Sequence, residues 1–272
     1  MPELPEVETT RRGVAPWIEG VRVSAVELRQ PLLRRPVPRR LATELPGRRV
    51  LAVERRAKYL LFRAEGDRTL LLHLGMSGHL RILQRPEPPG PHDHLDLVFE
   101  NGHTLRFHDP RRFGAADWLA GDPLRHPLLA PLGPEPLGPG FTPQYFAAAC
   151  RGRKVAIKQH IMNGRTVVGV GNIYASEALH HAGIHPARAA GRIGLTRLTA
   201  LVEAIRAVLE AAILQGGTTL RDFSWGEGQP GYFRTELAVY GRSGEPCLRC
   251  EGSIRAVVQG QRSTYYCRRC QR

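Results

Sequence analysis

The second and third residues of the chain, Pro2 and Glu3, are of types that could carry covalent chemistry. Initiator methionine is normally removed before a small residue, and its removal would expose the Pro2 nitrogen as a secondary amine that is partly uncharged near neutral pH. A secondary amine that attacks a sugar aldehyde carbon forms a charged iminium, which favours eliminations at the neighbouring carbons. Glu3 could supply a proton beside it. A simpler alternative is that Pro5 and the nearby carboxylates only begin a helix.

Four cysteines near the end of the chain have the spacing of a metal site. They form two C-x2-C pairs separated by sixteen residues. This spacing is typical of zinc bound by four thiolates, and a closed tetrahedron leaves no open position for catalysis. The sequence therefore predicts one structural Zn²⁺ held by Cys247, Cys250, Cys267 and Cys270. The fifth cysteine, Cys150, is expected to be a small apolar core residue.

The charge of the chain indicates a polyanionic partner. Lys and Arg number 39 against 25 Asp and Glu, which gives a formal net charge of +14 spread along the chain. Such a surface favours phosphate backbones, whose counterions are released on binding. A basic surface without a partner is the alternative. Neither a long apolar run nor a signal peptide is evident, so we expect a soluble, cytoplasmic protein.

Two segments in the first half of the chain combine tight turns with side chains that could project from them, although a lone Met usually fills a core and a lone His is usually hydrogen-bonded within one. His73-Leu74-Gly75-Met76-Ser77-Gly78 allows a tight turn that would project His73 and Met76 from a strand end. In Asp109–Gly114, Arg111 and Phe113 lie in a turn bounded by proline and glycine, which suits a wedge between bases. The alternative is a core phenylalanine flanked by surface arginines. His92 and His94 could share a strand face, but no third metal ligand is evident.

The elements that must position these residues change type along the chain. A helix is predicted over 6–18, followed by strands at 21–26, 50–53, 59–62, 70–72 and 95–99. Turn signals lie between them, and Asn101-Gly102 is the strongest hairpin signal. Many short strands at this spacing predict a β-sandwich or barrel.

The second half of the chain is helical. Seven prolines within 122–143 predict a stiff, extended linker. Helices are predicted at 144–150, 155–162 and 196–214, with another after Gly171-Asn172. The glycines before that helix could present backbone amides to a phosphate, although such a motif is often only a turn. Residues 216–233 form a long loop that we expect to be mobile.

Taken together, these motifs resemble a known family. Pro-Glu-Leu-Pro-Glu-Val-Glu-Thr at residues 2–9 is similar to the start of bacterial formamidopyrimidine-DNA glycosylases, which remove oxidised purines such as 8-oxoguanine and then cut the strand. The resemblance covers essentially the whole chain. It implies an α+β multidomain fold: an N-terminal β-sandwich with a leading helix (1–121), a proline-rich linker (122–143), a helical domain with a helix-two-turns-helix element and a base-capping loop (144–233), and a C-terminal zinc β-hairpin (234–272).

The resemblance also implies roles for individual residues. In the catalytic group, Pro2 would be the nucleophile and Glu3 the proton donor, while Lys58 and Arg262 would contact phosphates and assist the two eliminations. Met76 would fill the gap left by the everted nucleotide, Arg111 would bind the orphaned base, and Phe113 would be the wedge. The remaining residues implied to contact DNA are His73, His92, Arg153, Lys158 and Asn172.

The function implied is base excision repair. We expect a monomeric bifunctional DNA glycosylase and AP lyase that acts on damaged double-stranded DNA at the nucleoid, with no membrane and no obligate protein partner. One alternative is the sister branch that excises oxidised pyrimidines. Met76, Leu4-Pro5 and Pro230–Phe233 favour the purine branch. The other alternative is a non-catalytic zinc-ribbon protein that only binds nucleic acid.

Overall fold

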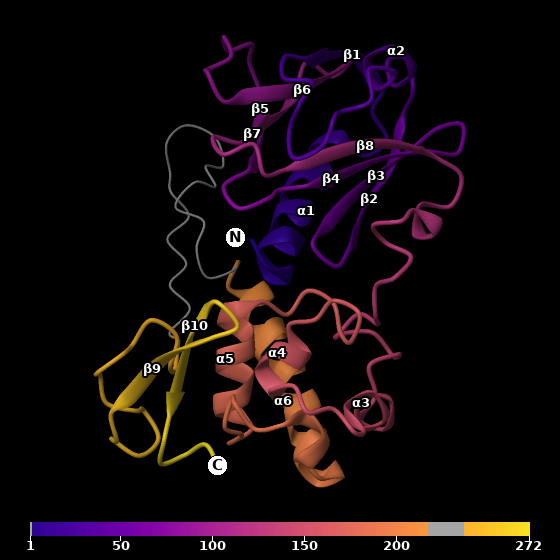
Figure 1. The fold of residues 1–272 in the computed structure, drawn as a ribbon. Helices are drawn as coiled ribbons and strands as arrows, with labels where there is room; N and C mark the ends of the chain where they lie inside the picture. The colour runs from indigo at the N-terminus through magenta and orange to yellow at the C-terminus, as the bar shows by residue number, and fades with distance from the viewer. Residues whose placement is uncertain (1, 217–236) are drawn as a thin grey trace. The chain divides into compact units, whose positions relative to one another are not determined.

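The computed structural model describes residues 2–216 and 237–272. These residues form two compact units, each with its own core (Figure 1). The first unit is built on the chain up to Ala130, and the second on Pro131–Gln215 together with the chain from residue 237 onwards.

Helix α1 (Leu4–Ile18) opens the first unit. The predicted helix over 6–18 is confirmed, but it begins two residues earlier because Glu3 is its N-cap. Glu3 and Glu6 form a reciprocal capping box, in which each side chain accepts a hydrogen bond from the other residue's backbone N–H. Leu4, Val7 and Ile18 are buried, and α1 packs against β2 and β5 of the sandwich.

Two four-stranded antiparallel sheets form the predicted sandwich. Their orders are β1-β6-β7-β5 and β2-β3-β4-β8, and their apolar inner faces share one core. The unit also contains the short helices α2 (Leu41–Glu44) and η1 (Pro123–Arg125). The strands are β1 (Val23–Leu28), β2 (Val50–Arg56), β3 (Tyr59–Ala64), β4 (Arg68–His73), β5 (His79–Leu83), β6 (Asp93–Phe99), β7 (Thr104–His108) and β8 (Ala115–Ala120).

Three of these strands, β5, β7 and β8, were not predicted, because polar side chains interrupt their apolar pattern. In β7, Arg106 is 3% exposed and donates to both carboxylate oxygens of Asp96 on neighbouring β6, at 3.0 and 3.2 Å from Nε. A buried ion pair of this kind needs a partner from another strand, which local periodicity does not reveal. The Asn101-Gly102 turn does join paired strands, β6 and β7.

The second unit contains helices α3 (Pro143–Cys150), α4 (Ile157–Ile161), α5 (Asn172–His181) and α6 (Leu195–Leu214), with the short helix η2 (Ala190–Arg192). Cys150 lies in its core as expected, and burial raises the pKa of the Cys150 thiol to about 12. Among the helices of the described ranges, none is long and apolar enough to cross a membrane.

The later part of the proline-rich segment packs on this core instead of standing free. Phe141 is fully buried, and the Arg206 guanidinium on α6 donates to the carbonyls of Pro136, Gly138 and Phe141. This part of the proline-rich segment is therefore an irregular coil that is hydrogen-bonded to Arg206 of α6.

The last element is an antiparallel hairpin of β9 (Ile254–Gln259) and β10 (Arg262–Cys267). Gly260 and Gln261 both have positive φ, at 56° and 59°, which is the conformation of a type I′ turn. The turn places Arg262 at the exposed tip of the hairpin.

Candidate functional site

The amino end of the first unit places Pro2 directly before the buried cap of α1. Pro2 is half-buried, and Glu3 is 3% exposed. The Glu3 backbone N–H donates to Glu6 Oε2 at 2.8 Å. Because α1 is anchored in the core, this capping box holds the start of the chain in one conformation. The Pro2 nitrogen becomes an amine only once Met1 is removed.

Glu8, which sequence reasoning missed, fastens α1 to the sandwich. Its carboxylate accepts hydrogen bonds from Arg12 at 2.9 Å and from Arg55 of β2 at 3.0 Å, and it also pairs with Arg11. Burial opposes ionisation of Glu8, but the hydrogen bonds from Arg11 and Arg12 outweigh it and hold the pKa of Glu8 below its ordinary value. The ion pair with Arg55 thus ties α1, which follows Pro2 in the chain, to β2.

Lys58 and His73 lie side by side in the first unit. Lys58 is in the tight turn between β2 and β3, after Ala57 at φ 56°, and directly precedes β3. Tyr59 pairs with His73, and their ring centroids are 4.9 Å apart. Burial, with the positive charge of Lys58, lowers the pKa of His73 to about 4. Since His73 Nδ1 accepts the Gly75 N–H at 2.9 Å, a neutral imidazole carries its proton on Nε2.

Two exposed side chains project from adjacent loops of this unit. Met76, after β4, is 37% exposed and Phe113, before β8, is 43% exposed. The Arg111 guanidinium carbon lies 4.6 Å from the centroid of the Phe113 ring, in cation–π contact. Both side chains are therefore accessible, as the expected insertion into DNA requires, and that role stays a prediction.

His92 is exposed, whereas the two residues that follow it are buried and engaged. Asp93 Oδ1 lies 2.8 Å from His108 Nδ1, and His94 Nε2 lies 2.8 Å from the Asp109 carbonyl. The His92 ring meets the His108 ring edge-on at 5.7 Å. Asp93 and His94 therefore support the loop, and His92 is its outward-facing member.

In the second unit a buried ammonium connects three elements. Lys158 on α4 is 1% exposed. Its Nζ donates to Asn172 Oδ1 at 2.7 Å, Thr264 Oγ1 at 2.8 Å and the Ser263 carbonyl at 3.1 Å. An ammonium has three protons, so these three acceptors match its full capacity. Lys158 joins α4, the start of α5 and the zinc hairpin.

The expectation that Lys158 contacts DNA stays a prediction. Its burial among three internal acceptors forms a clamp that sequence alone could not show, because the acceptors lie 14 and more than 100 residues away. Arg153 and Arg262 are exposed, as phosphate contacts must be. Asn172 is the first residue of α5, whose N-cap is Gly171, and its Nδ2 donates to the Ser263 carbonyl at 3.0 Å.

Glu177 on α5 is a second residue that the sequence did not single out. It is 4% exposed, and its carboxylate accepts the backbone N–H groups of Ala238, Val239 and Tyr240 at 2.7 to 3.0 Å. It therefore anchors the chain immediately after residues 217–236. The predicted base-capping loop, over residues 216–233, lies outside the described residues except for Gly216.

The four predicted cysteine ligands come together as expected. Their sulfur atoms all lie within 4.8 Å of one another. The separations of Cys250 from Cys267 and of Cys247 from Cys270 are 3.4 and 3.9 Å. A tetrahedron with Zn–S bonds of about 2.3 Å has edges of about 3.8 Å, so the set fits one structural zinc. His180 Nε2 on α5 lies 3.4 Å from Cys247 Sγ.

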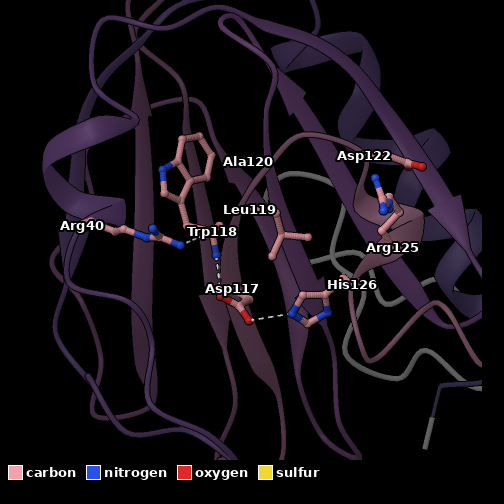
Figure 2. A pocket seen from close by; sticks show the side chains of 8 residues that line it. All are labelled: Arg40, Asp117, Trp118, Leu119, Ala120, Asp122, Arg125 and His126. Carbon is pink, nitrogen blue, oxygen red and sulfur yellow. Dashed lines mark hydrogen bonds and ion pairs between the residues drawn. The ribbon is translucent and has the colours of Figure 1, made fainter.

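A polar cavity of about 350 Å³ in the first unit gathers none of these residues (Figure 2). It lies beside β8 and η1, where His126 Nε2 pairs with Asp117 Oδ2 at 3.2 Å and Arg40 donates to the Trp118 carbonyl at 2.8 Å. Because no residue expected to act on DNA lines it, the cavity does not define the reactive centre.

Comparison with known proteins gives a consistent result along the chain. Residues 1–116 match the formamidopyrimidine-DNA glycosylase N-terminal domain, residues 132–224 the formamidopyrimidine-DNA glycosylase H2TH domain, and residues 244–272 the zinc finger found in FPG and IleRS. Curated formamidopyrimidine-DNA glycosylases from Syntrophotalea carbinolica and Thioalkalivibrio sulfidiphilus are 58% and 57% identical over 272 residues, covering 100% of both chains in each pair.

Solved structures agree with the sequence matches. The MutM (Fpg) protein of Thermus thermophilus is 41% identical, with a TM-score of 0.87 over 99% of this chain and 98% of that one. The G226P mutant of Lactococcus lactis FPG, in complex with DNA containing Fapy-dG, is 34% identical with a TM-score of 0.92 over 100% of both chains. The chain described here belongs to the formamidopyrimidine-DNA glycosylase family.

Proposed function

We propose that this protein is a bifunctional DNA glycosylase and AP lyase of base excision repair, which excises oxidised purines from duplex DNA. The observation that carries the proposal is the family relationship over the whole chain, together with a Pro2-Glu3 start held by a buried capping box. Lactococcus lactis relatives are solved with Fapy-dG DNA and with abasic-site DNA, which are the substrate and the intermediate of such an enzyme.

The reaction begins with the free Pro2 amine. Its nitrogen attacks the anomeric carbon of the damaged nucleotide, the bond from that carbon to the base breaks, and the departing base takes up the proton that the amine loses. Glu3 supplies a proton to the ring oxygen as the bond between that oxygen and the anomeric carbon breaks. Opening of the sugar gives an iminium, which withdraws electrons so that β-elimination and then δ-elimination break the two phosphate ester bonds. Lys58 and Arg262 contact phosphates beside the reacting sugar and assist these steps.

The purine must leave the base stack before Pro2 can reach its sugar. Met76 fills the gap, Phe113 wedges the neighbouring step, and Arg111 hydrogen-bonds the orphaned base. Support comes from the exposure of Met76 and Phe113 and from the guanidinium stacked on the Phe113 ring. His73 and His92, also in the first unit, contact the DNA backbone.

The second unit contributes affinity for the DNA duplex. Arg153, Asn172 and Arg262 contact phosphates, which position the duplex without reading its sequence. Lys158 contributes indirectly, because its three hydrogen bonds set the orientation of Asn172 and of the hairpin that carries Arg262. The protein works as a monomer at the nucleoid in the cytoplasm, a placement supported by its bacterial relatives and its charge of +14.

Borohydride trapping tests the proposal directly. Reduction of the iminium should join the wild-type protein covalently to DNA that contains 8-oxoguanine, and the same lesion should be preferred over thymine glycol. Mass spectrometry of the active protein should show Pro2 at the terminus. A wild-type protein that binds damaged DNA but forms no adduct would leave only the non-catalytic alternative, and a preference for thymine glycol would place it in the pyrimidine branch.

A further inference from the structure

A buried carboxylate at the start of the loop that carries Phe113 contacts the loop that carries Met76. Asp109 is fully buried. Its Oδ1 accepts the Ser77 hydroxyl at 2.7 Å, from the loop of Met76. Its Oδ2 accepts the Gly114 N–H at 2.7 Å, from the loop of Phe113. One side chain thus holds both loops through short, charge-assisted hydrogen bonds.

The backbone of Asp109 adds a third loop to this connection. Its N–H donates to the His92 carbonyl at 2.9 Å, and its own carbonyl lies 2.8 Å from His94 Nε2. The same carbonyl accepts the Arg112 N–H at 3.1 Å, which closes the turn below Phe113. The segments that present His92, Met76 and Phe113 therefore all meet at Asp109.

The loops are also in direct backbone contact. Gly75 has φ +72°, and a Cβ there would lie 2.4 Å from the Phe113 carbonyl carbon and 2.5 Å from the Gly114 nitrogen. A Cβ on Gly114 would lie 2.6 Å from the Phe107 ring and 2.9 Å from the His73 carbonyl oxygen. Since real Cβ atoms are not found this close to backbone atoms, only glycine permits this approach. Neither loop can shift far without the other.

We propose that Asp109 is a positioning residue that joins the Met76 loop and the Arg111–Phe113 loop into one rigid body, which enters damaged DNA as a unit. This inference rests on the proposed function and deepens it. Joined loops have already lost the conformational freedom that two separate loops would lose on insertion, so the coupling favours eversion by preorganisation. Filling of the gap and wedging of the adjacent step then occur together.

Hydrogen exchange tests the coupling without DNA or activity. Ser77→Ala removes a hydroxyl that donates to Asp109 and accepts the Arg111 N–H at 3.4 Å. The substitution should accelerate amide exchange at residues 112–114 of the other loop, beyond the amide that Ser77 itself bonds, by on the order of fivefold. Ser77→Thr keeps the hydroxyl and should restore wild-type exchange. Ser24→Ala, which removes a surface hydroxyl bonded to the Val98 carbonyl, is the matched control. Acceleration confined to residues 74–78 would overturn the inference.

A second readout separates positioning from general damage to the protein. Asp109→Asn and Ser77→Ala should slow excision from 8-oxoguanine duplexes by at least tenfold while sparing lyase activity on an abasic site in single-stranded DNA, where no gap is filled. Equal loss of both activities, or no loss of either, would refute the coupling. If the wild-type protein has neither activity, the proposed function fails instead, and the exchange experiment still decides whether the loops are joined.

Discussion

In each of the two units a buried charged side chain joins segments that are far apart in the sequence, and the two charges have opposite sign. In the first, the Asp109 carboxylate gathers a hydroxyl and an amide from two loops. In the second, the Lys158 ammonium gathers three oxygen acceptors from α5 and the hairpin. A fully paired buried ion fixes orientation strongly, because loss of either partner leaves a desolvated group unsatisfied. We infer that each unit is preorganised around its ion. The proposed nucleophile, Pro2, belongs to the first unit, and the proposed phosphate contact Asn172 belongs to the second.

The largest effect should come from separating these two roles. Pro2→Gly should lower the yield of trapped adduct by at least about 100-fold, because the secondary amine is lost, while the Kd for damaged DNA stays near that of the wild type. Asn172→Ala should do the reverse, raising the Kd severalfold and preserving the adduct at saturating DNA. Trapping and fluorescence anisotropy measure both quantities. If each variant impaired both quantities equally, chemistry and binding would not divide between the units.

Removal of the Lys158 charge should destabilise the protein more than removal of an exposed lysine charge from the same segment. In Lys158→Met three acceptors lose their donor, which should lower the free energy of unfolding by about 3 kcal/mol. Lys154→Met, at an exposed lysine of the same segment, should change it by less than about 0.5 kcal/mol. Denaturant titration gives both values. Similar stabilities for the two variants would mean that the clamp contributes nothing.

Glu8 offers a pH-dependent test in the first unit. Its pKa in the folded protein lies below the ordinary value of 4.5, so its contribution is fully present above pH 4.5 and is lost as pH falls through the folded pKa. Glu8→Gln should be less stable than the wild type at pH 7 by about 1 kcal/mol, and this difference should shrink below pH 4.5. Unfolding measured across this range shows the trend. A difference that is constant with pH would exclude the ionised carboxylate as its source.

The contact between His180 and Cys247 Sγ should slow zinc loss. An N–H donated to a metal-bound thiolate stabilises its charge, and His180→Phe fills the buried space without that donor. Zinc release to a chelator should be severalfold faster in His180→Phe, and His180→Gln should recover part of the difference. His181→Phe, at the next residue, is the control. Unchanged release would show that the 3.4 Å contact is only packing.

The smallest effect concerns the proton on His73. Burial and Lys58 lower its pKa to about 4 from the ordinary 6.5, so the imidazole stays neutral at physiological pH. The stability that follows from its neutrality is present above pH 6.5 and declines as pH falls toward 4. An NMR titration should find the His73 resonance, assigned with His73→Gln, unchanged between pH 6 and 8. A midpoint in that interval would mean that His73 meets DNA as a cation.

Several features of this protein were predictable from local sequence. Alternating apolar runs predicted the sandwich strands with continuous apolar cores, and 3.6-residue periodicity predicted α3, α4 and α6. One strand that sequence missed, β7, contains the buried Arg106, whose partner Asp96 lies on another strand. The linker predicted over 122–143 includes Phe141, which is in fact part of the core of the second unit. The sequence does not reveal this burial, because it depends on contacts with residues far along the chain.

The sequence by itself determined the chemical types: an amine-forming Pro2, a zinc site set by cysteine spacing, and a basic surface. Those properties depend on residue identity and short spacings along the chain. Tertiary structure alone decided that Asp109 joins two loops, that Lys158 faces inward, and that Glu8 fastens α1. Each of these roles requires partners far apart in sequence, at hydrogen-bonding distance and away from water, and no local pattern encodes that meeting.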